Sequence, residues 1–366
     1  MARIVTVYSR KHQNFAPSDM SYIRWLKISE ALARLGHHVD IATNEFGGLR
    51  WWRKRFPIPV GENLRRVPLS EVRWHRYDVV KTLFHHGFDT LEKYGGSDHP
   101  FIISKLGSVV GPVDMEGIYF YGKSRKRLYL TQKKIDQKGR YITLLNDAAK
   151  ELWISCFGPR DNILIVPGGV EKCIPTSSKN PYPPGKGKRC VFAGNIYGRF
   201  SQPDANKTLV NKLNRLGKLL KGYDIQLYMI GAGNIRRLDR GYVNHLGVVP
   251  HERAWDYFHY AHAGVVVAAG GFMHNNESSK IYHYLRAGLP VVSESGFPND
   301  HIVRESRLGF AVENGNMELM AEKIHEAADK DWDRDYAVSY ILNNHTWDKR
   351  AEVYNGIIKE GQQKRL

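Results

Sequence analysis

The sequence predicts an α/β protein with two doubly wound, Rossmann-like domains that face a cleft. Short apolar segments alternate with helix-like segments, and this alternation restarts after a stretch rich in Pro, Gly, Ser and Lys. The 366 residues suit two domains at about 100–200 residues each. We therefore expect domains over 1–170 and 189–335, a linker over 171–188, and helices over 336–366.

The first domain opens with a predicted strand–helix–strand unit. Ile4–Tyr8 is a short apolar run, and Ser18 or Asp19 can cap a helix that Gly36 ends. Residues 37–43 form the next expected strand, and such a unit implies parallel strands joined by a right-handed crossover. Further strands are expected at 77–84, 101–104, 142–145 and 163–169, with a helix starting near Asp147.

The second domain repeats the pattern. Its expected strands are 189–194, 225–231, 264–268 and 290–293, and helices are expected over 333–364. Ligands of open parallel sheets bind beyond the carboxyl ends of the strands. Candidate site residues are therefore expected in the loops that follow these strands.

Composition and charge exclude several classes of protein. Apolar residues make up 42% and aromatic residues 11%, too much for a disordered chain. The net charge is +17, of which residues 1–170 carry +11 and the remainder +6. A surface of this charge attracts anions, so phosphorylated ligands, acidic lipid and nucleic acid are all candidate partners.

Cysteine usage and hydropathy bear on the compartment. Cys156, Cys173 and Cys190 are too few and too scattered for a disulfide framework or a cysteine-based metal site. The first residues lack the order of a signal peptide, and no apolar run approaches the ~20 residues needed to span a bilayer. The expectation is a cytoplasmic protein.

One basic segment, residues 51–55, also contains large aromatic residues. Such side chains can enter the headgroup region of a membrane while the cations meet anionic lipid. A solvated loop with partly buried tryptophans is an equally good interpretation. The segment comprises Trp51, Trp52, Arg53, Lys54 and Arg55, and a second basic cluster follows at 123–134.

Residues 275–293 are the most informative stretch. A polar loop leads into a helix capped by Asn276 or Ser278, and Gly288-Leu-Pro ends it before a strand. The free N–H groups and dipole of a helix start favour a phosphate, and Lys280 can add a full charge. An ordinary capped helix is the alternative.

At these residues the sequence resembles nucleotide-sugar-dependent glycosyltransferases of the GT-B fold, especially the family-4-like group, also called group 1. Their second domain carries Ser-x-Lys-x-x-Glu-Tyr-x-x-x-Gly-x-Pro-Val-Val, and residues 278–292 match most of it. Further similar segments follow in the family's order over nearly the whole chain: Ile165–Val170, Phe192–Gly194, Tyr228–Gly233 and His245–Pro250. In the family a final helix returns to the first domain, and 336–366 could do so.

The resemblance implies a donor nucleotide bound mainly by residues 190–295. Gly194 and Asn195 would let the backbone approach the phosphates, while Arg199 and Lys207 would neutralise them. The other implied donor contacts are Gly231, His245, Ser278, Ser279, Lys280 and His283.

One departure from the family concerns the ribose. The carboxylate that grips the ribose hydroxyls falls on His283, which cannot accept two hydroxyls as a carboxylate does. Its partner acid, expected at Asn275, is displaced to Glu277. Glu277 is therefore the candidate acid near the sugar, with a helix-start glutamate as the alternative.

The reaction implied by the resemblance needs a stabilised leaving group more than a metal, because departure of a nucleoside diphosphate builds negative charge. Enzymes of the group that this sequence resembles generally need no divalent ion, so neither a metal nor a cofactor is expected beyond a UDP- or GDP-sugar co-substrate. An inverting enzyme also needs a base for the acceptor hydroxyl. Candidates are Asp114 and Glu116, which could equally be loop carboxylates; His85 and His86 could line the acceptor side or be core histidines.

The expected function is metal-independent transfer of a sugar to a hydroxyl of a glycan, lipid-linked or cell-envelope acceptor. The inner face of the cell membrane would be its site of action. A DNA-modifying glucosyltransferase of the same fold is an alternative, since the charge of +17 suits phosphate backbones. A catalytically idle module that binds anions is another, and a non-hydrolysing sugar-nucleotide epimerase is a remoter one.

Overall fold

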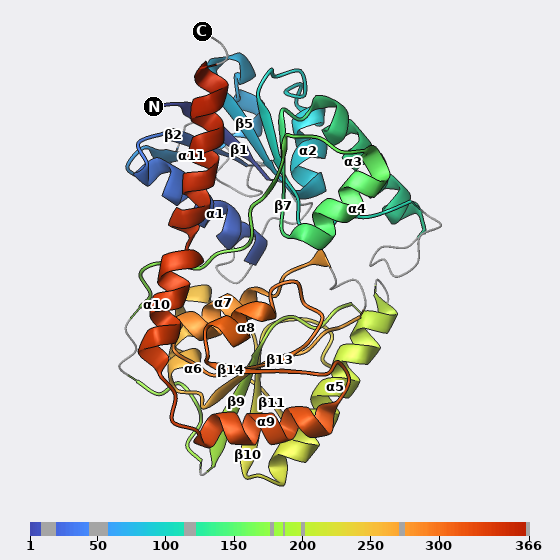
Figure 1. The fold of residues 1–366 in the computed structure, drawn as a ribbon, viewed down its shortest axis with the longest axis vertical. Helices are drawn as coiled ribbons and strands as arrows, with labels where there is room; N and C mark the ends of the chain where they lie inside the picture. Colours follow the sequence, from blue (N-terminus) through green and yellow to red (C-terminus); the bar gives the residue numbers. More distant parts are fainter. Residues whose placement is uncertain are drawn as a thin grey trace, which may run out of the picture. The chain divides into compact units, whose positions relative to one another are not determined.

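The computed structural model describes residues 1–8, 20–43, 58–112, 122–175, 179–185, 187–198, 202–270 and 275–363. Contacts between residues divide them into two compact units (Figure 1). Unit 1 combines the residues through Gly168 with Trp347 and the residues after it, and unit 2 comprises Gly169–Thr346. Each unit is an α/β layer structure around its own sheet.

Unit 1 contains an eight-stranded sheet with the order β3-β4-β2-β1-β5-β6-β7-β8. All neighbouring strands are parallel except β3 and β4, which form an antiparallel edge. The strands are β1 (Arg3–Val7), β2 (His38–Thr43), β3 (Ile58–Gly61), β4 (Leu64–Pro68), β5 (Val79–Leu83), β6 (Ile102–Lys105), β7 (Tyr141–Leu144) and β8 (Ile163–Ile165).

Helices cover both faces of this sheet (Figure 1). Side chains alternate along β1, so Ile4 packs with Trp25 and Tyr354 on one face while Val5 packs with Phe88 on the other. Helices α1 (Met20–Arg34) and α11 (Trp347–Gln363) cover the first face. The helices that follow β5, β6 and β7 are α2 (Phe84–Lys93), α3 (Gly122–Lys138) and α4 (Asp147–Phe157).

Unit 2 contains a six-stranded, fully parallel sheet with the order β11-β10-β9-β12-β13-β14. The chain starts in the middle with β9, builds outward through β10 and β11, and then returns to β12 on the other side of β9. The strands are β9 (Lys188–Ala193), β10 (Ile225–Ile230), β11 (Val243–His245), β12 (Ala263–Val266), β13 (Val291–Glu294) and β14 (Gly309–Val312). This reversal between β9 and β12 is the switch point where doubly wound sheets bind ligands.

The helices of unit 2 lie on both faces of its sheet (Figure 1). One core joins the sheet to α6 (His251–His259), α7 (Ser279–Arg286), α8 (His301–Glu305) and α10 (Arg334–Asn344). On the other side, α5 (Pro203–Lys221) packs on β10, α9 (Met317–Asp329) packs on β13, and the two helices contact each other.

The predicted parallel α/β architecture is confirmed, with differences at its edges. The β3–β4 hairpin and the short strands β11 and β14 were not expected, because three- to five-residue strands carry little periodic signal. Residues 336–346 lie in unit 2, where Ala337 and Ile341 are fully buried; only the chain from Trp347 belongs to unit 1. Across the described ranges, no helix has the length and apolar character that crossing a membrane requires.

Candidate active site

His85 and His86 open α2, directly after β5 in unit 1. His85 is buried, and its Nε2 lies 2.9 Å from Oε1 of Gln132. Burial lowers the pKa of His85 to about 4, although the hydrogen bond with Gln132 works against the shift. An amide oxygen can only accept, so Nε2 is the donor, and the lowered pKa leaves the ring neutral at pH 7. His85 therefore has the geometry of a core histidine that joins α2 to α3, while His86 is partly exposed.

A basic cavity of roughly 30 Å³ lies at the carboxyl ends of the unit 1 strands and was not anticipated from the sequence. Lys105 donates from Nζ to the carbonyls of Leu144 (3.2 Å) and Val166. Nζ of Lys81 lies 4.6 Å from the centroid of the Tyr354 ring, and burial lowers the pKa of Lys81 to about 7. No pattern in the sequence could have found this cavity, because α11 supplies one of its walls from the far end of the chain.

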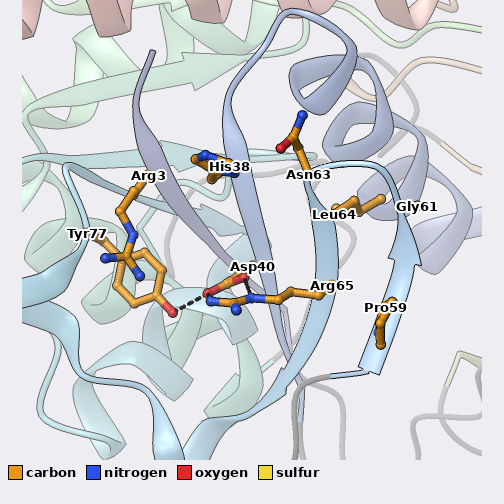
Figure 2. A pocket seen from close by; sticks show the side chains of 9 residues that line it. All are labelled: Arg3, His38, Asp40, Pro59, Gly61, Asn63, Leu64, Arg65 and Tyr77. Atoms are coloured by element: carbon orange, nitrogen blue, oxygen red, sulfur yellow. Dashed lines mark hydrogen bonds and ion pairs between the residues drawn. The ribbon is translucent and has the colours of Figure 1, made fainter.

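A wider pocket of about 490 Å³ lies at the opposite, amino-terminal edge of the same sheet (Figure 2). Asp40 is its buried centre: its carboxylate accepts from the Arg65 guanidinium at 2.6 and 2.9 Å and from the Tyr77 hydroxyl at 2.7 Å. Burial and the neighbouring Asp40 raise the pKa of Tyr77. Every acceptor oxygen of Asp40 thus has a partner within the protein, and the edge is not the one at which such sheets bind ligands.

Several predicted site residues lie outside the described residues. They are the candidate bases Asp114 and Glu116, the candidate phosphate contact Arg199, and the basic aromatic residues Trp51, Trp52, Arg53, Lys54 and Arg55.

In unit 2, the loops after β9 and β10 come together at Gly194 and Gly231. Gly231 has φ +147°, and a Cβ there would lie 2.1 Å from the carbonyl oxygen of Gly194. Gly233, at φ +121°, would in the same way meet the carbonyl of Ile196 at 2.0 Å. Glycine is therefore required for these two loops to touch, which explains the glycines seen in the sequence.

Asn195 and His245 fix the same pair of loops through polar contacts. Asn195 accepts a hydrogen bond from the Ala232 N–H at 2.7 Å. His245 Nε2 lies 2.9 Å from the carbonyl oxygen of Gly231, so this nitrogen carries the proton. Both side chains thus hold the backbone of the loop after β10, at Gly231 and Ala232, next to the switch point.

Lys280 projects across the same end of the sheet. Its Nζ lies 5.1 Å from the centroid of the Phe192 ring, and a Cβ on Gly194 would come within 2.9 Å of its Cε. The missing side chain at Gly194 therefore makes room for the lysine stem. A cation at the first turn of α7 and the bare backbone after β9 consequently lie next to each other.

The start of α7 is held in place by Asn299. Its Oδ1 accepts from the Ser278 N–H and its Nδ2 donates to the Ser278 carbonyl, both at 2.9 Å. Ser278 occupies the N-cap position, as expected, but its hydroxyl makes no cap hydrogen bond. Glu277 precedes it and is 7% exposed.

Tyr284 joins α7 to the sheet. Its hydroxyl accepts from the Ala193 N–H at 2.8 Å and donates to the Val191 carbonyl at 3.2 Å. A Cβ on Gly264 would come within 2.4 Å of its ring, so β12 needs glycine at this crossing. The tyrosine of the sequence motif thus fixes the distance between the α7 start and the loop after β9.

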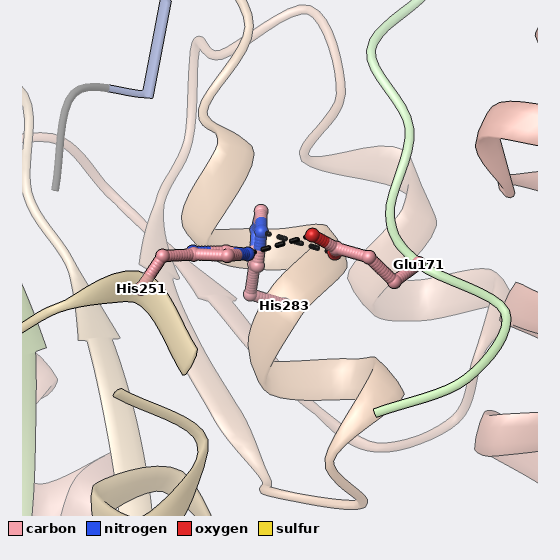
Figure 3. A group of neighbouring side chains, drawn as sticks. All are labelled: Glu171, His251 and His283. Atoms are coloured by element: carbon pink, nitrogen blue, oxygen red, sulfur yellow. Dashed lines mark hydrogen bonds and ion pairs between the residues drawn. The ribbon is translucent and has the colours of Figure 1, made fainter. Parts of the chain in front are cut away.

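His283, predicted to contact the donor, lies in a cluster with Glu171 and His251 (Figure 3). His251 Nε2 lies 2.7 Å from Oε1 of Glu171, and His283 Nε2 lies 3.9 Å from Oε2. Burial works to raise the pKa of Glu171, but the hydrogen bond with His251 and the nearby imidazoles lower it to about 2. Glu171 and His251 were not singled out in the sequence, where no spacing links them to His283.

The remaining donor candidate in the described part, Lys207, is exposed in the second turn of α5. Most of the predicted donor residues thus gather around the carboxyl ends of β9 and β10 and the start of α7: Gly194, Asn195, Gly231, His245, Ser278, Ser279 and Lys280.

Comparison with known proteins agrees with this architecture. Residues 211–335 match the family described as glucosyltransferase 3-like, C-terminal domain. No curated protein matches the sequence.

Solved structures similar to this chain include three enzymes of low sequence identity. A sucrose-phosphate synthase from Thermosynechococcus elongatus is 13% identical and has a TM-score of 0.68; the match covers 100% of this chain and 98% of the synthase chain. The trehalose-6-phosphate synthase OtsA is 11% identical and has a TM-score of 0.71; the match covers 98% of this chain and 99% of the OtsA chain. WaaG, a glycosyltransferase involved in lipopolysaccharide biosynthesis, is 13% identical, with 96% and 94% covered and a TM-score of 0.56.

At these sequence identities the solved structures show the fold alone, and the family match indicates the class of enzyme. Both agree with the glycine loops, the switch point and the lysine at the α7 start described above. The chain is a GT-B-fold glycosyltransferase whose residues 211–335 match the glucosyltransferase 3-like C-terminal domain.

Proposed function

We propose that this protein transfers a sugar from a UDP- or GDP-sugar to a hydroxyl of a glycan, lipid-linked or cell-envelope acceptor. The observation that carries the proposal is the convergence of Gly194, Lys280 and the first turn of α7 at the switch point of unit 2. Bare backbone, a lysine and free helix N–H groups together form a site suited to a diphosphate.

The donor would lie with its diphosphate between the loop after β9 and the α7 start. On one side, the backbone at Gly194 and Asn195 can approach the phosphate oxygens because no Cβ intervenes at Gly194. On the other, the Ser279 amide and Lys280 supply a donor and charge, while the Ser278 N–H, which the resemblance also assigns to the phosphates, already donates to Asn299. His245 and Gly231 would meet the nucleotide from the β10 side.

The chemistry follows from where charge develops. When the bond between the sugar and the diphosphate breaks, negative charge grows on the departing oxygen. Donors that already point at this position stabilise it without reorganising, so the transfer does not require a metal at the diphosphate. Lys280 is held for this role by Phe192 beneath it and by the missing side chain at Gly194.

The other catalytic assignments remain predictions. Glu277 is assigned as the acid near the sugar, because it directly precedes Ser278 and is mostly buried. Asp114 or Glu116 is assigned as the base that takes the proton of the acceptor hydroxyl. Arg199 and Lys207 are assigned as further diphosphate contacts.

The acceptor proposal depends on charge. The charge of +11 on residues 1–170 and the Trp- and Arg-rich segment at 51–55 favour an acceptor held at an anionic membrane surface. The similarity of fold to WaaG, whose description names lipopolysaccharide biosynthesis, is compatible with an acceptor of this kind.

The test is a thermal-shift and turnover panel with UDP, GDP, dTDP and their common sugars, without added metal. We expect one diphosphate to raise the Tm of the wild type and not that of Lys280→Ala. Lys221→Ala is the matched control, because Lys221 also lies over an aromatic ring, that of Tyr242 at 5.6 Å, and is exposed at the end of α5. No shift with any nucleotide, or an equal loss in both variants, would contradict the proposed donor site.

A further inference from the structure

Three segments of unit 2 bring metal-ligating side chains together. Glu171 follows Val170 at the start of the unit, His251 is the first residue of α6, and His283 lies in the middle of α7. Their ligand atoms all lie within 4.8 Å of one another. Figure 3 shows the Glu171 carboxylate pointing toward both imidazole rings.

The proton on His283 can be placed from its neighbour. Its Nδ1 lies 2.6 Å from the carbonyl oxygen of Ser279. Because a carbonyl can only accept, Nδ1 holds the proton, and in the neutral ring Nε2 presents its lone pair to Glu171. The 3.9 Å between Nε2 and Oε2 is too long for a hydrogen bond. Two ligands that bind one tetrahedral ion at about 2.0–2.2 Å lie about 3.4 Å apart, so a movement of about 0.5 Å would let Nε2 and Oε2 bind the same ion.

The Glu171 carboxylate supplies a second, independent observation. Its side chain is 10% exposed, and Oε2 is buried with no hydrogen-bond partner in the part of the chain that the structure describes. Arg286 approaches the residue but donates to its backbone carbonyl at 3.2 Å instead. A buried carboxylate oxygen without a donor is costly unless a cation reaches it.

The surroundings of the cluster resemble those of protein metal sites. Trp255, which is 1% exposed, lies with its ring centroid 5.3 Å from that of His283 and 5.9 Å from that of His251. An apolar wall of this kind limits access of water, and a backbone carbonyl on Nδ1 orients a ligating imidazole. The side chains of His251 and Glu171 are each 10% exposed.

From this geometry we propose that Glu171, His251 and His283 bind a divalent transition-metal ion of the Zn²⁺ type. Two imidazoles and one carboxylate are a ligand set that Zn²⁺ accepts, with a fourth position left for water. The ion would replace the hydrogen bond between His251 and Glu171, with His251 then holding its proton on Nδ1. It would tie the start of unit 2 to α6 and α7, and because it is argued from the ligand atoms alone it does not depend on the proposed function.

The experiment is metal binding to the full-length, tag-free chain after dialysis against a chelator. We expect one equivalent of Zn²⁺ per chain by titration, a Zn²⁺-dependent rise in Tm, and a visible absorption band on Co²⁺ addition that marks low coordination. His251→Ala should weaken Zn²⁺ binding by more than the about 10–100-fold that loss of a ligand's supporting contact costs. Glu171→Gln should also weaken it and should abolish the Co²⁺ band.

The matched control is His259→Ala, since His259 lies in the last turn of the same helix outside the cluster. It should retain wild-type Zn²⁺ affinity. If the wild type binds no stoichiometric Zn²⁺ or Co²⁺, or if His251→Ala and His259→Ala bind it equally, the proposal is wrong and the cluster is an ion-pair network of the protein alone. Circular dichroism of each variant without metal establishes that a lost site is not a lost fold.

Discussion

Replacing Lys81 with methionine should stabilise unit 1. Lys81 lies in β5, is 3% exposed, and places its ammonium group over the ring of Tyr354. Burial alone lowers the pKa of Lys81 from 10.5 to about 7. Methionine has a similar shape and no charge to desolvate, so Lys81→Met should relieve the cost of burying an ammonium group.

The size of the effect follows from the two pKa values. Each pKa unit is worth about 1.4 kcal/mol, so at pH 7 the shift lowers the free energy of unfolding by at most about 4 kcal/mol. Hydration of the small cavity and loss of the contact with Tyr354 reduce the net gain. We expect Lys81→Met to raise the free energy of unfolding of unit 1 by about 2 kcal/mol at pH 7.

The sign of the pH dependence is fixed by which state binds the proton. Between pH 7 and 10.5 the unfolded lysine is protonated while the folded one is largely neutral. The unfolded state thus binds more protons, and the stability of the wild type rises with pH over this range relative to the methionine variant. The advantage of the variant should be constant well below pH 7 and should shrink by about 2 kcal/mol between pH 7 and pH 9, which brings it close to zero at pH 9.

The assay is urea unfolding at pH 6, 7, 8 and 9, followed by pulsed hydrogen exchange and mass spectrometry of a peptide from β5, so that unit 1 is observed by itself. Lys93→Met is the matched control, because Lys93 also lies over a tyrosine ring, that of Tyr94 at 5.6 Å, but is exposed. A methionine variant less stable than the wild type at pH 7, or a difference that does not change with pH, would refute the reasoning.

Three further substitutions test unit 2. Gly231→Ala should destabilise the unit by about 2–4 kcal/mol and abolish nucleotide-induced Tm shifts, because its Cβ would lie 2.1 Å from the Gly194 carbonyl; urea unfolding measures the first effect. Tyr284→Phe should cost about 1–3 kcal/mol, since it leaves a buried backbone N–H unpaired after β9. Asn299→Ala removes both hydrogen bonds to the Ser278 backbone, so amide exchange at the α7 start should accelerate about 10-fold or more.

Each of these has an outcome that would contradict it. Gly296 has φ +98° and no atom within 4 Å of an added Cβ, so Gly296→Ala carries backbone strain without a clash. Equal losses at Gly296 and Gly231 would show that contact with Gly194 is unimportant. Tyr284→Phe with unchanged stability, or Asn299→Ala with unchanged exchange, would show that those hydrogen bonds do not hold the α7 start.

Local patterns sufficed for most of the architecture. The helix expected to end at Gly288 is α7, and Gly288 has the positive φ of +68° that such an ending needs. The helix expected near Asp147 is α4, capped by Asn146 through the Ala149 N–H at 2.9 Å. Caps, helix ends and apolar runs depend on neighbours within a few residues, so a sequence shows them directly.

The glycines and Lys280 of unit 2 could likewise be singled out from the sequence, because each belongs to a short motif beside a strand end. What the motif could not show is why each residue is needed. Only the folded sheet brings Gly231 against Gly194, and Gly194 against Lys280.

The sequence by itself determined the α/β class, the position of the switch-point loops and the excess of positive charge, since these depend on composition and local order. The tertiary structure decided the rest: the neutral, buried state of His85, the depressed pKa of Lys81, and the meeting of Glu171 with His251 and His283. His85 and its partner Gln132 are 47 positions apart, and Glu171 and His251 are 80 positions apart. The pKa of Lys81 depends on the burial of its side chain. Packing alone decides which remote side chains meet and which side chains lose contact with water, because no local pattern in the sequence encodes either one.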